Sequence, residues 1–222
     1  MSGSMVPRLV LKDLYLTRWM VAGSMAGGVV GIAMLPFGAV AAYVGGVSLL
    51  CTLVILNITV VMSAVVQERK DKVLLFVLSL PVSAAQQTQA KALATTIAFV
   101  VPWLLLTAAA AVVIEASGVP NGILPFLVTV LVYLLAYHWV LLAVALVTES
   151  NSWPATVITV GNISVNFLIP YLLGWPSVYR HMKGSAAIWT SDLLALIGVE
   201  LLVGIVALGL AIVWRTRRPD VI

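Results

Sequence analysis

The apolar positions of the chain gather into six long runs, separated by short breaks rich in glycine, proline or charged residues. An apolar helix needs roughly 20 residues to cross a bilayer, whereas a membrane-spanning strand alternates in polarity. The runs are continuous and do not alternate, so each predicts a membrane-spanning α-helix. We therefore expect an all-α integral membrane protein with a single transmembrane domain over residues 1–222, and with spans at about 19–35, 38–66, 89–114, 123–147, 153–173 and 189–214.

The break between the second and third runs contains a short apolar segment of its own. Residues 68–72 are five consecutive charged positions, and the predominantly apolar residues 73–80 follow and end at Pro81. A stretch of about eight residues is far too short to cross a bilayer. Ser83, followed three residues later by Gln86, predicts a capping box and the start of a new helix. The sequence thus predicts a separate short helix at the membrane surface, whose apolar side needs another protein to cover it.

Composition supports the membrane assignment, and the charges give an orientation. Hydrophobic residues make up 62% of the chain and charged residues 9%, whereas soluble domains are about 25% charged. Ten of the twelve Lys and Arg residues lie in segments on the same side as both termini, and only Arg180 and Lys183 lie on the other side. The positive-inside rule then predicts a multi-pass protein of the cell (inner or cytoplasmic) membrane with both termini cytoplasmic. The net charge of +4 is explained by topology and contact with membrane lipid, and we expect no nucleic-acid site.

Small residues mark one face of the first span. Gly23, Gly27 and Gly31 are spaced by four, which places them in a stripe where another helix can approach closely. This stripe predicts helix packing, either within one subunit or between two subunits.

Two segments flank the spans without crossing the membrane themselves. Residues 1–18 carry charges that do not gather on one face, and we expect residues 5–18 to form a weakly amphipathic helix at the cytoplasmic interface. Residues 170–191 contain two prolines and several aromatic residues on the outer side. This second segment predicts a broken stretch between the last two spans that can dip back into the membrane as a re-entrant element.

Motifs for catalysis are absent from the sequence. There is no nucleotide-binding glycine loop, no HExxH and no GxSxG motif, and neither His138 nor His181 has a carboxylate or cysteine near it in sequence. Clustered aspartates for a Mg²⁺-diphosphate site are also missing. We expect no catalytic residue, bound cofactor or metal site in this chain, and hence no enzymatic activity of its own.

Five polar side chains interrupt the apolar spans: Asn57, His138, Asn162, Asn166 and Glu200. The two later asparagines lie four residues apart and so share one helical face. Buried amides and histidines can bond helices to one another or contact a transported substrate. A carboxylate inside a membrane is costly, so Glu200 predicts either a structural pair or a role in a transport pathway.

The charged break resembles the coupling helix of permease subunits of type-2 ABC transporters, the small six-span exporter family. In that family the helix has a charged start, leucines and a Ser-Leu-Pro-Val-Ser end, and a helix with a lysine follows. The matching positions here are Glu68-Arg69, Leu74-Leu75, Leu78-Ser79-Leu80-Pro81-Val82-Ser83 and Lys91. A small residue is usual before the first leucine of the family pattern, and Lys72-Val73 depart from it.

The resemblance implies a partner-dependent function. Residues 67–88 would form the cytoplasmic coupling segment and bind one of two separate ATP-binding subunits, which hold ATP and Mg²⁺. The chain would pair with a second copy or a close relative to form the path of an exporter for an amphipathic or hydrophobic cargo, such as a peptide, antibiotic or lipid-like molecule. The expected contacts with the ATP-binding subunit are Glu68, Arg69, Leu74, Leu75, Leu78, Leu80 and Pro81.

Two other classes of function remain open on sequence alone. An ATP-independent carrier, channel or scramblase would depend on the intramembrane polar residues, with Glu200 and His138 at its centre. A membrane enzyme or a regulatory and assembly subunit is the third possibility.

Overall fold

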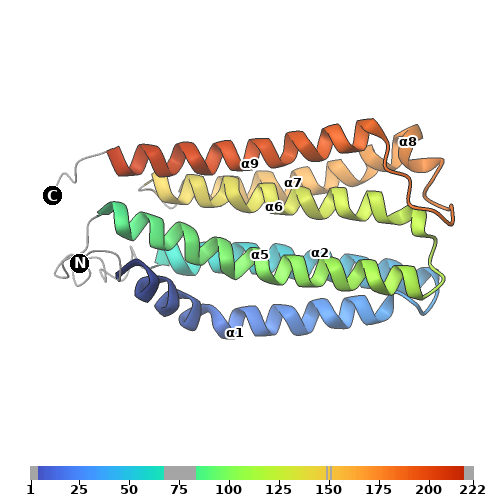
Figure 1. Cartoon of the computed structure of the whole chain (residues 1–222), viewed down its shortest axis with the longest axis horizontal. Coiled ribbons are helices and arrows are strands. Elements are labelled where there is room, and N and C mark those ends of the chain that lie inside the picture. Colours follow the sequence, from blue (N-terminus) through green and yellow to red (C-terminus); the bar gives the residue numbers. More distant parts are fainter. Residues whose placement is uncertain (1–4, 68–83, 149, 151, 218–222) are drawn as a thin grey trace.

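The computed structural model describes residues 5–67, 84–148, 150 and 152–217. These residues form helices joined by turns and short irregular connections, with no strand among them, and six of the helices are long and apolar enough to cross a membrane (Figure 1). Their order is α1 (Met5–Met34), α2 (Ala39–Val61) continued by the π-helix η2 (Met62–Gln67), α5 (Ala84–Ala116), the 3₁₀ turn η3 (Asn121–Ile123), α6 (Leu124–Val147), α7 (Ser152–Gly174), the short α8 (Pro176–Tyr179) and α9 (Ser191–Arg217).

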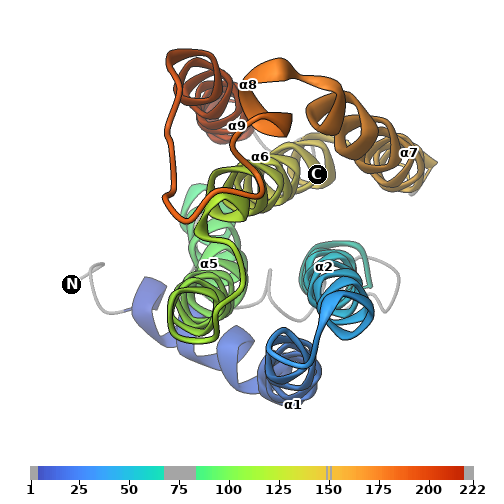
Figure 2. The same cartoon turned by 90° about the vertical axis from the view of Figure 1, so that its right-hand side faces the viewer.

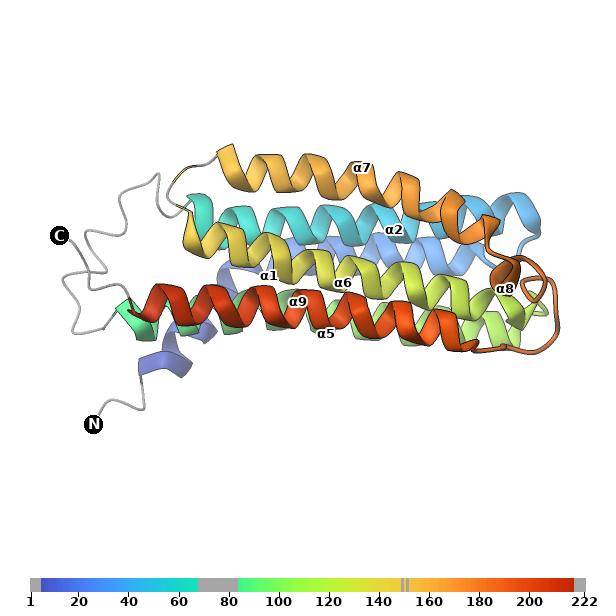
Figure 3. The ribbon, with the colours of Figure 1, turned by 90° about the horizontal axis from the view of Figure 1, so that it is seen from above.

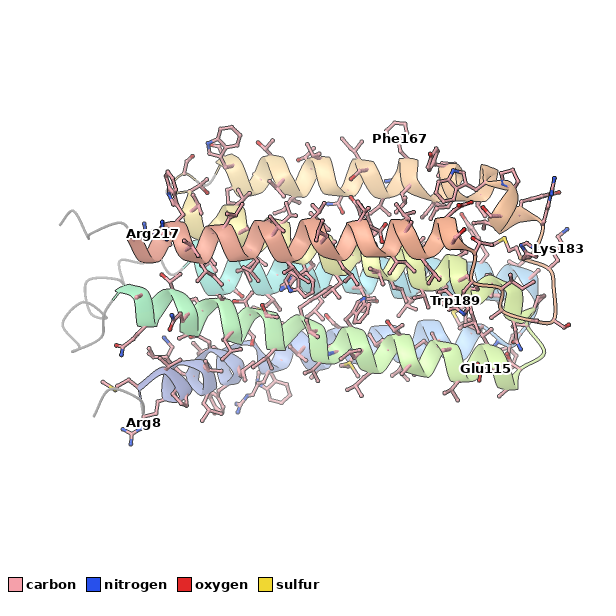
Figure 4. The ribbon with its side chains drawn as sticks, turned by 45° about the horizontal axis from the view of Figure 1, so that its top comes forward. Arg8, Glu115, Phe167, Lys183, Trp189 and Arg217 are labelled. Carbon is pink, nitrogen blue, oxygen red and sulfur yellow. The ribbon has the colours of Figure 1, made fainter. Side chains whose placement is uncertain are left out.

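The six apolar runs of the sequence correspond to these six long helices, which confirms the prediction of an all-α chain of multi-pass membrane type. The tight turn between α1 and α2 includes Gly38, whose φ of 96° is a conformation that side-chain-bearing residues avoid. Arg8 and Arg217 lie at one end of the bundle, the terminal end, and Glu115 and Lys183 lie at the opposite end (Figures 1 and 4).

The expected interfacial helix at 5–18 and the expected first span at 19–35 lie in one continuous helix, and the point where this helix enters the membrane stays a prediction. Helix α1 is continuous over its 30 residues. The physical reason is that no glycine or proline interrupts the chain between Pro7, in the first turn, and Gly23. The N-terminal part of α1 nevertheless turns away from the bundle axis and crosses the terminal end of α5 (Figure 2). There Val10 packs with Ala90 and Ala94 of α5.

Helix α6 lies in the middle of the molecule, between α5, α9 and α7 (Figure 2). The main core contains side chains from α2, α5 and α6 that are at most 1% exposed, among them Leu53, Leu56, Phe99, Leu131 and Leu141. Helices α2 and α5 pack on one side of α6, α1 packs on α2 and α5, and α9 packs along the other side of α6. Helix α7 packs mainly on α6, where Gly161 lets the Tyr137 ring come close, and it stands away from α2 (Figure 2).

The glycine stripe of α1 packs within the chain at two of its three positions. A Cβ atom on Gly31 would lie 2.8 Å from the backbone oxygen of Gly45, and one on Gly27 would lie 3.1 Å from Oγ1 of Thr52. Both contacts are with α2, and they explain why the two helices approach so closely. Gly23 has no atom within 4 Å of its Cβ position, so packing against another subunit stays a prediction there.

The broken segment between the last two spans begins later than expected. Helix α7 runs through Pro170 to Gly174, which membrane helices tolerate because neighbouring groups can satisfy the freed backbone oxygen. Helix α8 and the following turns then lie at the opposite end of the bundle (Figure 3). Val178 of α8 is buried, and the Gly122 N–H donates to the Gly184 oxygen across 3.0 Å. Re-entry of this segment into the membrane stays a prediction.

Candidate functional site

The segment that resembles a coupling helix lies outside the described residues. This includes all the expected contacts with an ATP-binding subunit: Glu68, Arg69, Leu74, Leu75, Leu78, Leu80 and Pro81. The structure does describe the two helices on either side of the segment. Both η2, which ends at Gln67, and α5, which begins at Ala84, have these ends at the terminal end of the bundle (Figure 1).

The last turn of the second helix is widened next to this segment. Residues Met62–Gln67 form a π-helix, in which each backbone hydrogen bond spans five residues instead of four. Such turns are rare and occur frequently at functional sites. Ala64 and Val65 of this turn are buried, so the widened turn is packed into the bundle.

A buried ion pair fastens α1 to the start of α5. Lys91 Nζ lies 2.9 Å from Oδ2 of Asp13, and the two residues are only 9% and 4% exposed. Lys12 Nζ lies 3.4 Å from the other carboxylate oxygen, and its side chain is 42% exposed. The Asp13–Lys91 pair therefore joins the N-terminal part of α1 to α5, the helix that follows residues 68–83.

Sequence reasoning missed this pair, although the sequence contains a signal for it. Asp13 is the single acidic residue before Glu68, and it stands in an otherwise apolar and basic stretch. Such an isolated carboxylate needs a partner once it is buried. From the sequence, Lys91 matches the family motif and counts among the basic residues that predict the topology. The structure shows that it also pairs with Asp13.

Two of the intramembrane polar residues meet in the core. His138 of α6 and Asn57 of α2 are joined by a hydrogen bond of 2.9 Å between Nδ1 and Oδ1, in which the imidazole donates to the amide oxygen. The His138 ring also stacks on Phe99 of α5, with centroids 4.3 Å apart. All three side chains are at most 1% exposed. This cluster connects three helices, which is the arrangement expected of interhelical bonding.

Glu200 lies on α9 without a partner among the described residues. It is 8% exposed, and neither carboxylate oxygen has a hydrogen bond or ion pair there. Gly204, one turn further along α9, is also buried and packs against the Trp139 ring of α6. The structural pair that the sequence allowed for Glu200 is not found in the described part of the chain.

The remaining two polar residues line a groove between α2 and α7. Asn162 and Asn166 lie on one face of α7, and Asn166 Nδ2 donates to the Asn162 backbone oxygen across 2.8 Å. The groove has a volume of about 460 Å³, and α2 contributes Tyr43 and Cys51 to its wall. Most of the other lining residues are aliphatic: Val47, Leu50, Val54, Ile55, Val165 and Ile169. The lining is thus amphipathic, with amide and hydroxyl groups set into an apolar surface.

The five predicted polar residues therefore occupy three separate places. Asn57 and His138 are together in the core, Glu200 is on α9, and the two α7 asparagines face the α2–α7 groove. Among the described residues, no group of three or more His, Cys, Asp or Glu side chains is arranged to hold a metal ion.

No family model matches the chain, and no curated protein is significantly similar to it.

Proposed function

We propose that this chain is the membrane-spanning permease subunit of an ATP-driven ABC exporter. The observation that carries the proposal is the charge-led apolar segment at residues 68–82, which ends at a proline and connects the second and third spanning helices. The six long apolar helices of the described residues fit the layout of the small six-span exporters. In this proposal two ATP-binding subunits supply the energy and hold ATP and Mg²⁺, and a second permease copy or a close relative completes the complex.

Helix α5 is long enough to carry motion from this segment into the membrane. Its 33 residues extend over roughly 50 Å, compared with roughly 30 Å for the hydrocarbon core. The base of α5 is bonded to α1 through Asp13 and Lys91, and α1 packs closely on α2 at Gly31. A displacement of residues 68–82 would therefore move α1, α2 and α5 together.

Such a displacement would change the groove between α2 and α7. Helix α2 packs together with α1 and α5, whereas α7 packs mainly on α6. Movement of one wall relative to the other would open or close the amphipathic surface that Asn162 and Asn166 line. We propose this groove as the contribution of one subunit to the path of an amphipathic or hydrophobic cargo.

The test is co-expression with an ABC ATP-binding subunit encoded in a neighbouring reading frame. Leu74→Asp places a charge in the apolar run of residues 73–80, and we expect it to abolish co-purification and the stimulation of ATP hydrolysis while the permease still accumulates in the membrane. Leu74→Met has a similar volume and is the matched control, which should behave like wild type. Undiminished association of the Leu74→Asp variant would refute the role given to residues 68–82.

One observation favours a second candidate, an ATP-independent carrier. Glu200 is buried without a partner among the described residues, and such intramembrane carboxylates often mark transport pathways. Purified protein in liposomes, without any ATP-binding subunit, would then move solute by itself, and Glu200→Gln would stop it. Absence of transport by the chain alone would exclude this candidate for the solutes tested.

A further inference from the structure

A second groove runs between α6 and α9 at the terminal end of the bundle. Its volume is about 820 Å³, within the range of about 300–1,000 Å³ typical of ligand sites. The walls are mostly apolar and include Val144 and Val147 of α6 and Ala207 and Leu210 of α9. None of the five intramembrane polar residues discussed above lines it, so it is separate from the α2–α7 groove.

The groove ends at a tryptophan and an arginine. Trp214 and Arg217 follow Ala207 and Leu210 on one stripe of α9, with Arg217 at the last turn of the helix (Figure 4). Arg217 is exposed, and it makes no ion pair with another residue of the described chain. Tryptophan favours the level of lipid headgroups, and a guanidinium binds phosphate through paired hydrogen bonds.

The dimensions of this groove fit one leaflet of a bilayer. The ten residue steps from Ala207 to Arg217 extend over about 15 Å of helix, which is half of a hydrocarbon core of roughly 30 Å. An acyl chain can therefore lie along the apolar walls while its headgroup reaches the arginine. Basic pockets between spanning helices are known to hold anionic headgroups in this way.

We propose that the α6–α9 groove is a binding site for one anionic phospholipid, taken from the leaflet at the terminal end of the bundle. Its acyl chain occupies the surface formed by Val144, Val147, Ala207 and Leu210, and its phosphate bonds to Arg217. The charge at Arg217 makes the site selective for anionic over zwitterionic lipid.

Native mass spectrometry of the full chain in detergent tests the site, with phosphatidylglycerol and phosphatidylcholine of identical acyl chains as the two ligands. We expect wild type to bind phosphatidylglycerol about fivefold more tightly, the effect of one arginine near an anionic headgroup. Arg217→Gln should remove this preference and Arg217→Lys should keep most of it. Arg180→Gln is the matched control, because Arg180 is an exposed arginine at the opposite end of the chain's bundle, and it should leave the preference unchanged.

A second variant locates the acyl chain. Ala207 is half-buried in the groove wall, so Ala207→Trp should fill the groove and weaken binding of both lipids at least tenfold. Equal binding of the two lipids by wild type, or an unchanged preference in Arg217→Gln, would overturn the proposal even if Ala207→Trp fails to fold. Displacement of the lipid by glycerol phosphate alone would also overturn it, because the headgroup would then bind without the groove. No ATP-binding subunit is present in these measurements, so their outcome is independent of the proposed transport function.

Discussion

The buried ion pair between Asp13 and Lys91 gives the sharpest prediction for the stability of the bundle. Changing Lys91 to Met removes the partner at 2.9 Å from the Asp13 carboxylate, which is 4% exposed, and among the described residues leaves it the more distant Lys12. Loss of one partner of a buried pair costs about 3–5 kcal/mol, because the other charge remains buried. Since Lys12 lies 3.4 Å away and can partly compensate, we expect a loss of about 3 kcal/mol in the free energy of unfolding.

Substituting Asp13 alone, and Asp13 together with Lys91, distinguishes the energy of the pair from the energy of each side chain with its other neighbours. Asp13→Leu alone should also destabilise the fold, because it removes the carboxylate that lies 2.9 Å from the buried ammonium group of Lys91. The double variant should regain most of the loss, since an apolar replacement of a whole buried pair is often neutral or stabilising. Lys12→Met is the matched control: Lys12 is exposed, and an exposed pair contributes at most about 1 kcal/mol.

The assay is reversible unfolding in mixed micelles of mild detergent and dodecyl sulfate, followed by far-UV circular dichroism. A double-mutant cycle over the four proteins gives the coupling free energy of the two side chains directly. A coupling below about 1 kcal/mol would place the pair in the class of solvated surface pairs and would refute the reasoning from burial. It would also remove the support for joint movement of α1 and α5.

Three further changes test other parts of the structure. Gly31→Ala should destabilise the fold by about 1–3 kcal/mol in the same assay, because its Cβ would lie 2.8 Å from a backbone oxygen of α2, whereas Gly23→Ala should be harmless. His138→Leu should cost about 1–3 kcal/mol by leaving the amide of Asn57 without its bond, and adding Asn57→Leu should recover part of that loss. Asn166→Leu should alter transport in membrane vesicles containing the assembled complex while co-purification with the ATP-binding subunit stays at wild-type level. Loss of co-purification instead would count against a place for Asn166 in the cargo path.

The helices could be predicted from the sequence because each is a continuous apolar run with clear breaks. Gly38 in a turn and the loop before α6 are local features, and the helix bounds there agree with the structure to within a few residues. Helix α1 shows the limit of this reasoning. A helix can pass from the membrane interface into the membrane without a break. The chain contains no glycine or proline between Pro7 and Gly23 that would end the helix there.

The sites could be predicted only as single residues. The bond between Asn57 and His138 joins positions 81 apart, and the pairing of Asp13 with Lys91 depends on how α1 crosses α5. Neither follows from local spacing, because both depend on the rotation of one helix against another. The shared helical face of Asn162 and Asn166 follows from their four-residue spacing, which is a local feature of the sequence. The groove that they line is formed together with α2, so it could not be predicted from that spacing.

The most direct test of the proposed function is site-directed cross-linking from the segment between α2 and α5. In a Cys51→Ser background, which removes the one native cysteine, Leu78→Cys would carry a photoreactive thiol reagent, and Lys183→Cys at the opposite end of the bundle would carry the same reagent as a control. In membranes that contain a co-expressed ATP-binding subunit, we predict a cross-link to that subunit from position 78 and none from position 183. The absence of a cross-link from position 78, or equal cross-linking from both positions, would contradict the assignment of residues 68–82 as the point where ATP hydrolysis acts on this chain.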